Sequence, residues 1–260
     1  MSTKIGIFGG SGFYNIPNME KKDSISISTP YGMPSSSIDK FKLDDNEIYF
    51  IARHGINHEY PAHMVNYRAN IYAFKSLGVE RIISIQTVGS LKEEFSPGTI
   101  VIPDQFVDFT KKRDYSFYNG GKSIHISMAD PFCPELRGLA INTLKELNIK
   151  YQPKGNYVCI EGPRFSTRAE SHMFRSFADI IGMTLVPEVI LAREMEICYL
   201  SIATVTDYDS WKDSHVTAEE VTETMKQNVD KTLKILEKML PNIPKNHSCL
   251  CHTALKDAEI

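Results

Sequence analysis

Short β-branched apolar runs alternate along this chain with longer segments in which apolar residues recur at helical spacing. Alternation of this kind is typical of α/β proteins, in which helices cover a largely parallel sheet. The predicted strands are 5–8, 21–28, 48–52, 81–87, 99–102, 157–161, 180–183 and 197–205. The predicted helices are 66–77, 134–147, 167–177, 187–196 and 218–240. We therefore predict an α/β fold with a central mixed β-sheet flanked by helices.

The size and charge of the chain restrict its domain organisation and the classes of partner it can bind. Its 260 residues suit one large α/β domain, which we place at 1–240, followed by a polar and loosely held tail at 241–260. The net charge of −3 argues against binding to nucleic acid or anionic membranes. Apolar runs are short of the roughly 20 residues of a membrane span, and no signal-peptide pattern opens the chain. We expect a cytoplasmic protein.

Five cysteines lie at positions 133, 159, 198, 249 and 251. Paired C-x-x-C spacing is absent, which argues against a structural zinc site. In an ordinary cytosol the thiols would be reduced. Two disulfides are open alternatives: Cys249 with Cys251 in a small strained loop, and Cys133 with Cys198, because both flank elements expected in the core.

The run Thr206-Asp207-Tyr208-Asp209 directly follows the apolar segment 197–205. Two carboxylates two residues apart point the same way in an extended backbone, and α/β proteins bind ligands beyond the carboxyl ends of their strands. Such a pair can accept two N–H donors, or share a proton. Adenine offers a matching face, an exocyclic amine beside N7. The plainer interpretation is a strand-to-loop turn, where Asp is common.

A glycine-rich segment, Gly9-Gly10-Ser11-Gly12, follows the first predicted strand. Glycines let the backbone approach an anion, and the Ser11 hydroxyl adds a donor. Position 15 is Asn, so the dinucleotide pattern G-x-G-x-x-G is incomplete, and no Gly-Lys-Ser/Thr follows as in a P-loop. A phosphate-binding turn and a turn without ligand both stay open.

Basic side chains follow the predicted strand 48–52. Arg53 offers a planar fork of donors suited to an oxyanion, and His54 is its neighbour. His58 and His63 lie close by, but their spacing is not that of an ordinary ligand set, so we expect no metal there. The alternatives are contact with an anion and surface histidines without a ligand.

Short motifs follow one another in a characteristic order from residue 5 to about residue 240. They are GGSG (9–12), TPYG (29–32), RHG (53–55), VNYRAN (65–70), GSL (89–91), GTIVIPDQF (98–106), MADPFC (128–133), EGPRFSTRAE (161–170), GMT (182–184) and TDYD (206–209). This ordered set resembles the 5′-methylthioadenosine phosphorylase branch of the purine nucleoside phosphorylase family. The resemblance implies a single-domain nucleoside phosphorylase-like fold.

The resemblance also implies a reaction. Inorganic phosphate attacks C1′ of 5′-methylthioadenosine, and the products are adenine and 5-methylthioribose 1-phosphate, as in purine and methionine salvage. The enzyme would be a pentosyltransferase with phosphate as co-substrate and no cofactor, assembled as a homotrimer or a dimer of trimers. The alternative within the family is a preference for adenosine or 6-oxopurine nucleosides. Rivals outside this activity are a nucleotide-binding oxidoreductase and a binding protein without turnover.

The resemblance assigns roles to residues of this chain. Phosphate would meet Ser11, Arg53, His54, Thr87 and Thr184. The base would meet Phe165, Ser166, Asp207 and Asp209, the two aspartates being the catalytic pair. Ribose and its 5′ substituent would meet Met183, His58, Val221, Ala218 and, from a neighbouring subunit, His125.

Three positions refine these expectations. Asp207 stands where relatives specific for hypoxanthine and guanine carry Asn, so a 6-aminopurine is favoured. Gln86 precedes Thr87 where many relatives carry a small residue or Thr, which affects the side-chain part of the phosphate contact. The basic run 111–113 is expected to be a solvated loop.

Overall fold

The computed structural model describes residues 3–13, 16, 19–212 and 218–260. Its strands are β1 (Lys4–Gly9), β2 (Lys21–Ile25), β3 (Ile38–Leu43), β4 (Asn46–Ala52), β5 (Arg81–Ser90), β6 (Ile100–Val101), β7 (Gln105–Phe109), β8 (Tyr151–Gln152), β9 (Asn156–Ile160), β10 (Ile180–Gly182) and β11 (Cys198–Asp207). The α-helices are α1 (Tyr67–Ser76), α2 (Pro134–Glu146), α3 (Arg168–Phe174), α4 (Leu185–Glu194) and α5 (Ala218–Met239). Short 3₁₀ helices are η1 (Ala62–Met64), η2 (Leu240–Asn242) and η3 (Cys251–Thr253).

The predicted α/β class and mixed sheet are confirmed, and each predicted strand and helix has a counterpart. Three strands were missed. β3 and β7 carry polar side chains and are partly exposed, so their apolar alternation is weak. β8 has only two residues, too few for a periodic pattern.

The long strand β5 organises the sheet. It pairs in parallel with β1 over its first half and with β11 from Arg81 to Gly89, while β10 pairs antiparallel with its end. β4 lies parallel to β1 on the other side. The carboxyl ends of β1, β4, β5 and β11 therefore meet at one edge.

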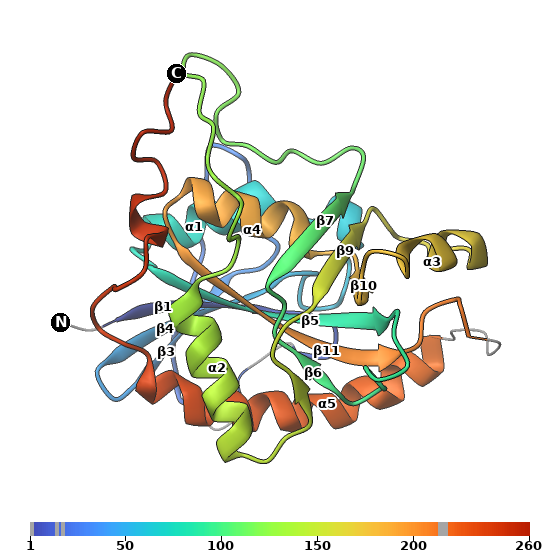
Figure 1. Ribbon diagram of the computed structural model, residues 1–260. Helices are drawn as coiled ribbons and strands as arrows, with labels where there is room; N and C mark the ends of the chain where they lie inside the picture. Colours follow the sequence, from blue (N-terminus) through green and yellow to red (C-terminus); the bar gives the residue numbers. More distant parts are fainter. Residues whose placement is uncertain (1–2, 14–15, 17–18, 213–217) are drawn as a thin grey trace.

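Helices cover both faces of the sheet. Figure 1 shows α1 and α4 on one face and α2 and α5 on the other. Successive residues of β5 enter the two apolar cores: Ile82 packs in a cluster with Phe74 of α1, and Ile83 in a cluster with Leu136 of α2 and Ile235 of α5. A strand buried on both faces reads as a continuous apolar run, which is why it was predictable. No helix in the described ranges is long and apolar enough to cross a membrane.

The segment after α5 is not loosely held, contrary to expectation. Ile243, Cys249 and Cys251 are buried in the core on the α2/α5 face. Further along, the backbone N–H of His125 donates to the Ala258 carbonyl at 2.8 Å, and in Figure 1 the chain end rises beside the loop around residue 120. The tail therefore closes part of the core, despite its polar composition.

Candidate active site

A cavity of about 270 Å³ opens where β1, β4, β5 and β11 end. This is the sheet edge at which α/β proteins hold ligands. It brings together residues from distant segments of the chain, and most predicted site residues line it: Ser11, Arg53, His54, His58, Thr87, Phe165, Ser166, Met183, Thr184, Asp207 and Asp209.

The glycine-rich turn after β1 forms one wall. The Phe13 N–H donates to the Gly10 carbonyl at 3.0 Å, and Gly12 adopts φ +80°, a left-handed value that favours glycine. A side chain at Gly10 would come within 2.5 Å of the Ile85 carbonyl oxygen. Glycine at both positions lets the turn fold against β5, with Ser11 at its corner in the cavity wall.

Arg53 is fully buried and mostly occupied by protein partners. Its Nε and Nη2 donate to the two carboxylate oxygens of Glu188 at 2.6 and 3.0 Å. Nη2 also donates to Ser84 Oγ at 2.6 Å, and Nη1 to the Ile85 carbonyl at 3.0 Å. These contacts use four of its five N–H donors and leave one on Nη1 among the described residues. Arg53 is thus a buried ion-pair partner that borders the cavity, and no sequence pattern indicated Glu188 as its partner.

His54 and His58 lie in the cavity wall with their rings stacked at 4.6 Å. His54 Nδ1 lies 2.8 Å from the Tyr60 carbonyl oxygen, which can only accept, so Nδ1 carries the hydrogen. Burial, and then the Arg53 charge, lower the His54 pKa to about 4. Near neutral pH the ring is uncharged, and its Nε2 is a hydrogen-bond acceptor.

The two aspartates at the end of β11 differ in their surroundings. A bulge between Val205 and Asp207 shifts the register of the pairing with β5 just before its last pair, Asp207 with Gly89. Thr206 Oγ1 donates to one carboxylate oxygen of Asp207 at 2.7 Å, and the Asp209 N–H donates to the other at 3.0 Å. The buried Asp209 carboxylate accepts from Ser166 Oγ at 2.6–2.7 Å. Asp207 therefore lies half-buried in the cavity wall, and the Asp209 backbone fixes the position of its carboxylate.

Arg113 was missed by the sequence interpretation. The expectation of a solvated loop holds for Lys111 and Lys112, which are exposed, but Arg113 is only 8% exposed. Its guanidinium donates to the Met183 and Glu161 carbonyls, each at 2.7 Å, and so ties together two segments of the cavity wall. An arginine beside two lysines carries no local signal of such a role.

The remaining predicted residues lie elsewhere. Gln86 is buried and accepts from Ser201 Oγ at 2.6 Å, within the sheet rather than in the cavity wall. His125 does not line the cavity of its own chain. The side chains of Ala218 and Val221 lie outside the described residues.

A family model described as "Phosphorylase superfamily" matches residues 4–241. This chain belongs to the phosphorylase superfamily. The sequence is 59% identical to S-methyl-5′-thioadenosine phosphorylase of Pyrococcus horikoshii, with 97% of this chain and 98% of the relative covered. It is 54% identical to the enzyme of the same name from Thermofilum pendens, over 99% of this chain and 98% of that one.

Solved structures of superfamily members share the fold. Methylthioadenosine phosphorylase from Schistosoma mansoni in complex with adenine superposes with a TM-score of 0.94 at 33% identity, covering 99% of both chains. The methylthioadenosine phosphorylase from an Antarctic soil metagenomic library gives a TM-score of 0.94 at 42% identity, covering 100% of this chain and 93% of the other. The resemblance found in the sequence motifs is thereby confirmed.

Proposed function

We propose that this protein is an enzyme that cleaves 5′-methylthioadenosine with inorganic phosphate. The products are adenine and 5-methylthioribose 1-phosphate. The observation that carries the proposal is that Ser11, His54 and Thr184, which we assign to the phosphate as an anion-binding wall, line the same cavity as the half-buried carboxylate of Asp207. Its relatives' names agree with this pairing of phosphate and adenine nucleoside.

Phosphate acts as the nucleophile. One of its oxygens forms a bond to C1′ as the C1′–N9 bond breaks, and the electron pair of that bond leaves with adenine. Positive charge builds on the ribose in between, and the phosphate anion stabilises it, so positioning and electrostatics supply most of the rate. Ser11, Thr87 and Thr184 hold the phosphate, the remaining Nη1 donor of Arg53 contributes, and His54 Nε2 accepts its hydrogen. The reaction needs no cofactor.

Adenine leaves more readily when N7 gains a proton. Asp207 faces N7 and the exocyclic amine, donating a proton to N7 or accepting hydrogen bonds from the base. Asp209 and Ser166 keep Asp207 in place, while Phe165 stacks near the base and Met183 meets the ribose. A 6-oxopurine would direct its carbonyl at the carboxylate, and mispairing of buried polar groups discriminates by about 10⁴-fold.

The 5′ side of the substrate needs an apolar pocket. We assign it to His58 and Val221 of the same chain and to His125 of a neighbouring subunit. His125 lies outside the cavity of its own chain, on an exposed segment that is hydrogen-bonded to the tail, which leaves its side chain available to a neighbouring subunit. The assembly is then a homotrimer or a dimer of trimers, in the cytoplasm, with residues 1–240 as the catalytic unit.

Adenine release from 5′-methylthioadenosine, measured with and without phosphate, tests the proposal. Adenosine and inosine serve as comparison substrates. Release that requires phosphate, with little from inosine, is expected. Release without phosphate would make the protein a hydrolase and remove the role of the anion-binding wall. Inosine as best substrate would overturn the role of Asp207.

A further inference from the structure

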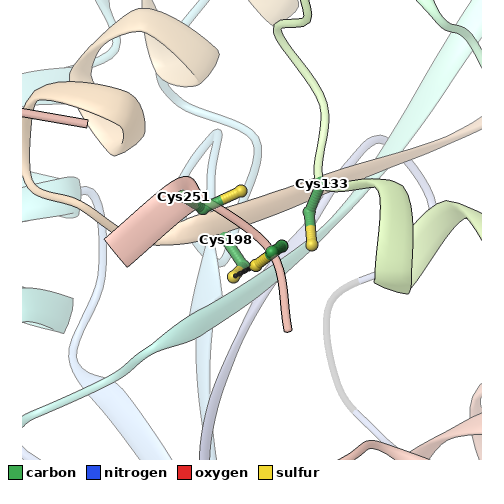
Figure 2. A group of neighbouring side chains, drawn as sticks. Cys133, Cys198 and Cys251 are labelled. Atoms are coloured by element: carbon green, nitrogen blue, oxygen red, sulfur yellow. Dashed lines mark hydrogen bonds between the residues drawn. The ribbon is translucent and has the colours of Figure 1, made fainter. Parts of the chain in front are cut away.

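Four cysteines converge at the end of β11 that lies away from the cavity. The sulfur atoms of Cys133, Cys198, Cys249 and Cys251 all lie within 4.8 Å of one another, and all four side chains are buried. Figure 2 shows that they come from different elements: Cys133 precedes α2, Cys198 begins β11, and Cys251 begins η3. None of the four lines the cavity.

Of the alternatives left open by the sequence, the structure has free thiols at all five cysteines and neither of the two disulfides. The Sγ atoms of Cys198 and Cys249 are 3.4 Å apart, a non-bonded separation. The expectation that Cys133 and Cys198 lie near each other is confirmed. The fold assembles the four sulfurs from three separate segments of the chain, so the absence of C-x-x-C spacing does not exclude a shared ligand site.

The arrangement suits a tetrahedral thiophilic cation. A zinc ion with sulfur ligands at about 2.3 Å separates those sulfurs by roughly 3.8 Å, a spacing compatible with this cluster. Thiols are weak hydrogen-bond donors and acceptors, so burying four of them against one another without a metal satisfies them poorly. Soft thiolate ligands in a tetrahedral set favour zinc among common divalent ions.

Basic groups surround the cluster and would balance the negative charge of four thiolates. Arg193 Nη1 lies 3.5 Å from Cys251 Sγ, and His247 Nδ1 lies 3.5 Å from Cys198 Sγ. Arg81 Nη1 is 3.3 Å from the other ring nitrogen of His247. Groups of this kind commonly orient metal ligands and stabilise their charge. A second set, His247 and His252 with Cys249, shares one thiol but includes the exposed His252.

We propose that Cys133, Cys198, Cys249 and Cys251 form a structural zinc site that fastens the C-terminal segment to β11 and the start of α2. All four positions are protein ligands, which leaves none for a substrate or water and makes the site structural rather than catalytic. It accounts for the burial of a tail whose polar composition alone predicts a loose end.

The 260-residue chain, produced in zinc-containing medium and purified under reducing conditions, tests the site. Elemental analysis should find about one zinc per chain. Native mass spectrometry should find the zinc bound to a chain whose mass shows that no disulfide has formed. Cys251→Ser should lose the metal, whereas Cys159→Ser should keep it. Cys159 is a matched control, because it is buried but lies outside the cluster.

Cobalt exchange covers the case in which Cys251→Ser fails to fold. Wild-type protein loaded with Co²⁺ should show the intense visible bands of a tetrahedral site and sulfur-to-cobalt charge transfer. Absence of both zinc and these bands, with free thiols, would overturn the proposal. So would two disulfides among the four cysteines in the metal-free protein.

Discussion

The two ends of β11 gather polar side chains in opposite ways. At the carboxyl end, Asp207 stays half-buried beside a cavity. At the amino end, Cys198 meets three other thiols in a cluster that is buried throughout. Reactive groups converge at both ends, so exposure distinguishes them. The carboxyl end with Asp207, the open end, has a position that can admit a substrate, whereas the amino end with Cys198, the closed end, is a closed set of the kind that serves structure.

The largest effect is expected at the open end. Asp207→Asn should lower kcat/KM for 5′-methylthioadenosine by about 10²–10⁴-fold, because the amide cannot protonate N7. Inosine should become relatively more favourable, since the amide can donate to its carbonyl. Steady-state kinetics on both nucleosides measure this, with the exposed Asp230→Asn as control. Unchanged preference for the adenine nucleoside would show that Asp207 does not select the base.

The next largest effect is expected on stability, when the buried ion pair of Arg53 and Glu188 beside the cavity is broken. Arg53→Ala leaves the Glu188 carboxylate buried without its partner, so the free energy of unfolding should fall by about 3–5 kcal/mol. Arg164→Ala, which breaks an exposed pair with Glu170, should cost about 0–1 kcal/mol. Denaturant titration compares them. Equal stability of the two variants, with only the phosphate KM raised in Arg53→Ala, would make Arg53 a phosphate ligand without a structural role.

Lowering the pH should reduce the free energy of unfolding through His54, which lies at the open end. Its pKa falls from 6.5 to about 4 on folding, so between these values the unfolded chain binds a proton that the folded ring does not. Stability from this group is therefore lost as the pH falls from 6.5 to 4, by about 3 kcal/mol. His54→Gln should remove this part of the pH dependence of unfolding. Identical slopes for both proteins would contradict the buried neutral ring.

Zinc should stabilise the fold by binding at the closed end. Free zinc at about 100 times its dissociation constant should stabilise the folded chain by about 2.7 kcal/mol. Thermal unfolding with zinc, with chelator and after zinc is restored measures this as a reversible shift in Tm. Cys159→Ser should keep the shift. No shift in the reduced wild-type protein would separate the thiol cluster from metal binding.

The smallest effect is expected from shortening the tail that the cysteine cluster holds in place and that contacts the segment around His125. Deleting residues 258–260 removes the acceptor for the His125 N–H and the Ile260 N–H that donates to the Ser123 carbonyl at 3.1 Å. If His125 serves a neighbouring subunit, the KM for 5′-methylthioadenosine should rise by up to about tenfold, with the phosphate KM unchanged. Parallel changes in both constants would mean that the tail only stabilises the fold.

Local patterns were enough to predict much of this protein. Apolar periodicity predicted the helices and the long strands, because backbone geometry sets both repeats within a few residues. The direction of Asp207 and the glycine turn before Phe13 follow from equally local rules. The motif order added the family and the membership of the cavity wall.

Tertiary structure alone decided the long-range partners. Arg53 with Glu188, Arg113 with Met183, and the four-cysteine cluster join residues far apart in sequence. Such contacts depend on strand register and on which helix covers which face, and neither is encoded in the spacing of neighbouring residues. The sequence therefore determined the elements and the chemistry available to them, whereas packing determined which side chains line the cavity and which contact one another.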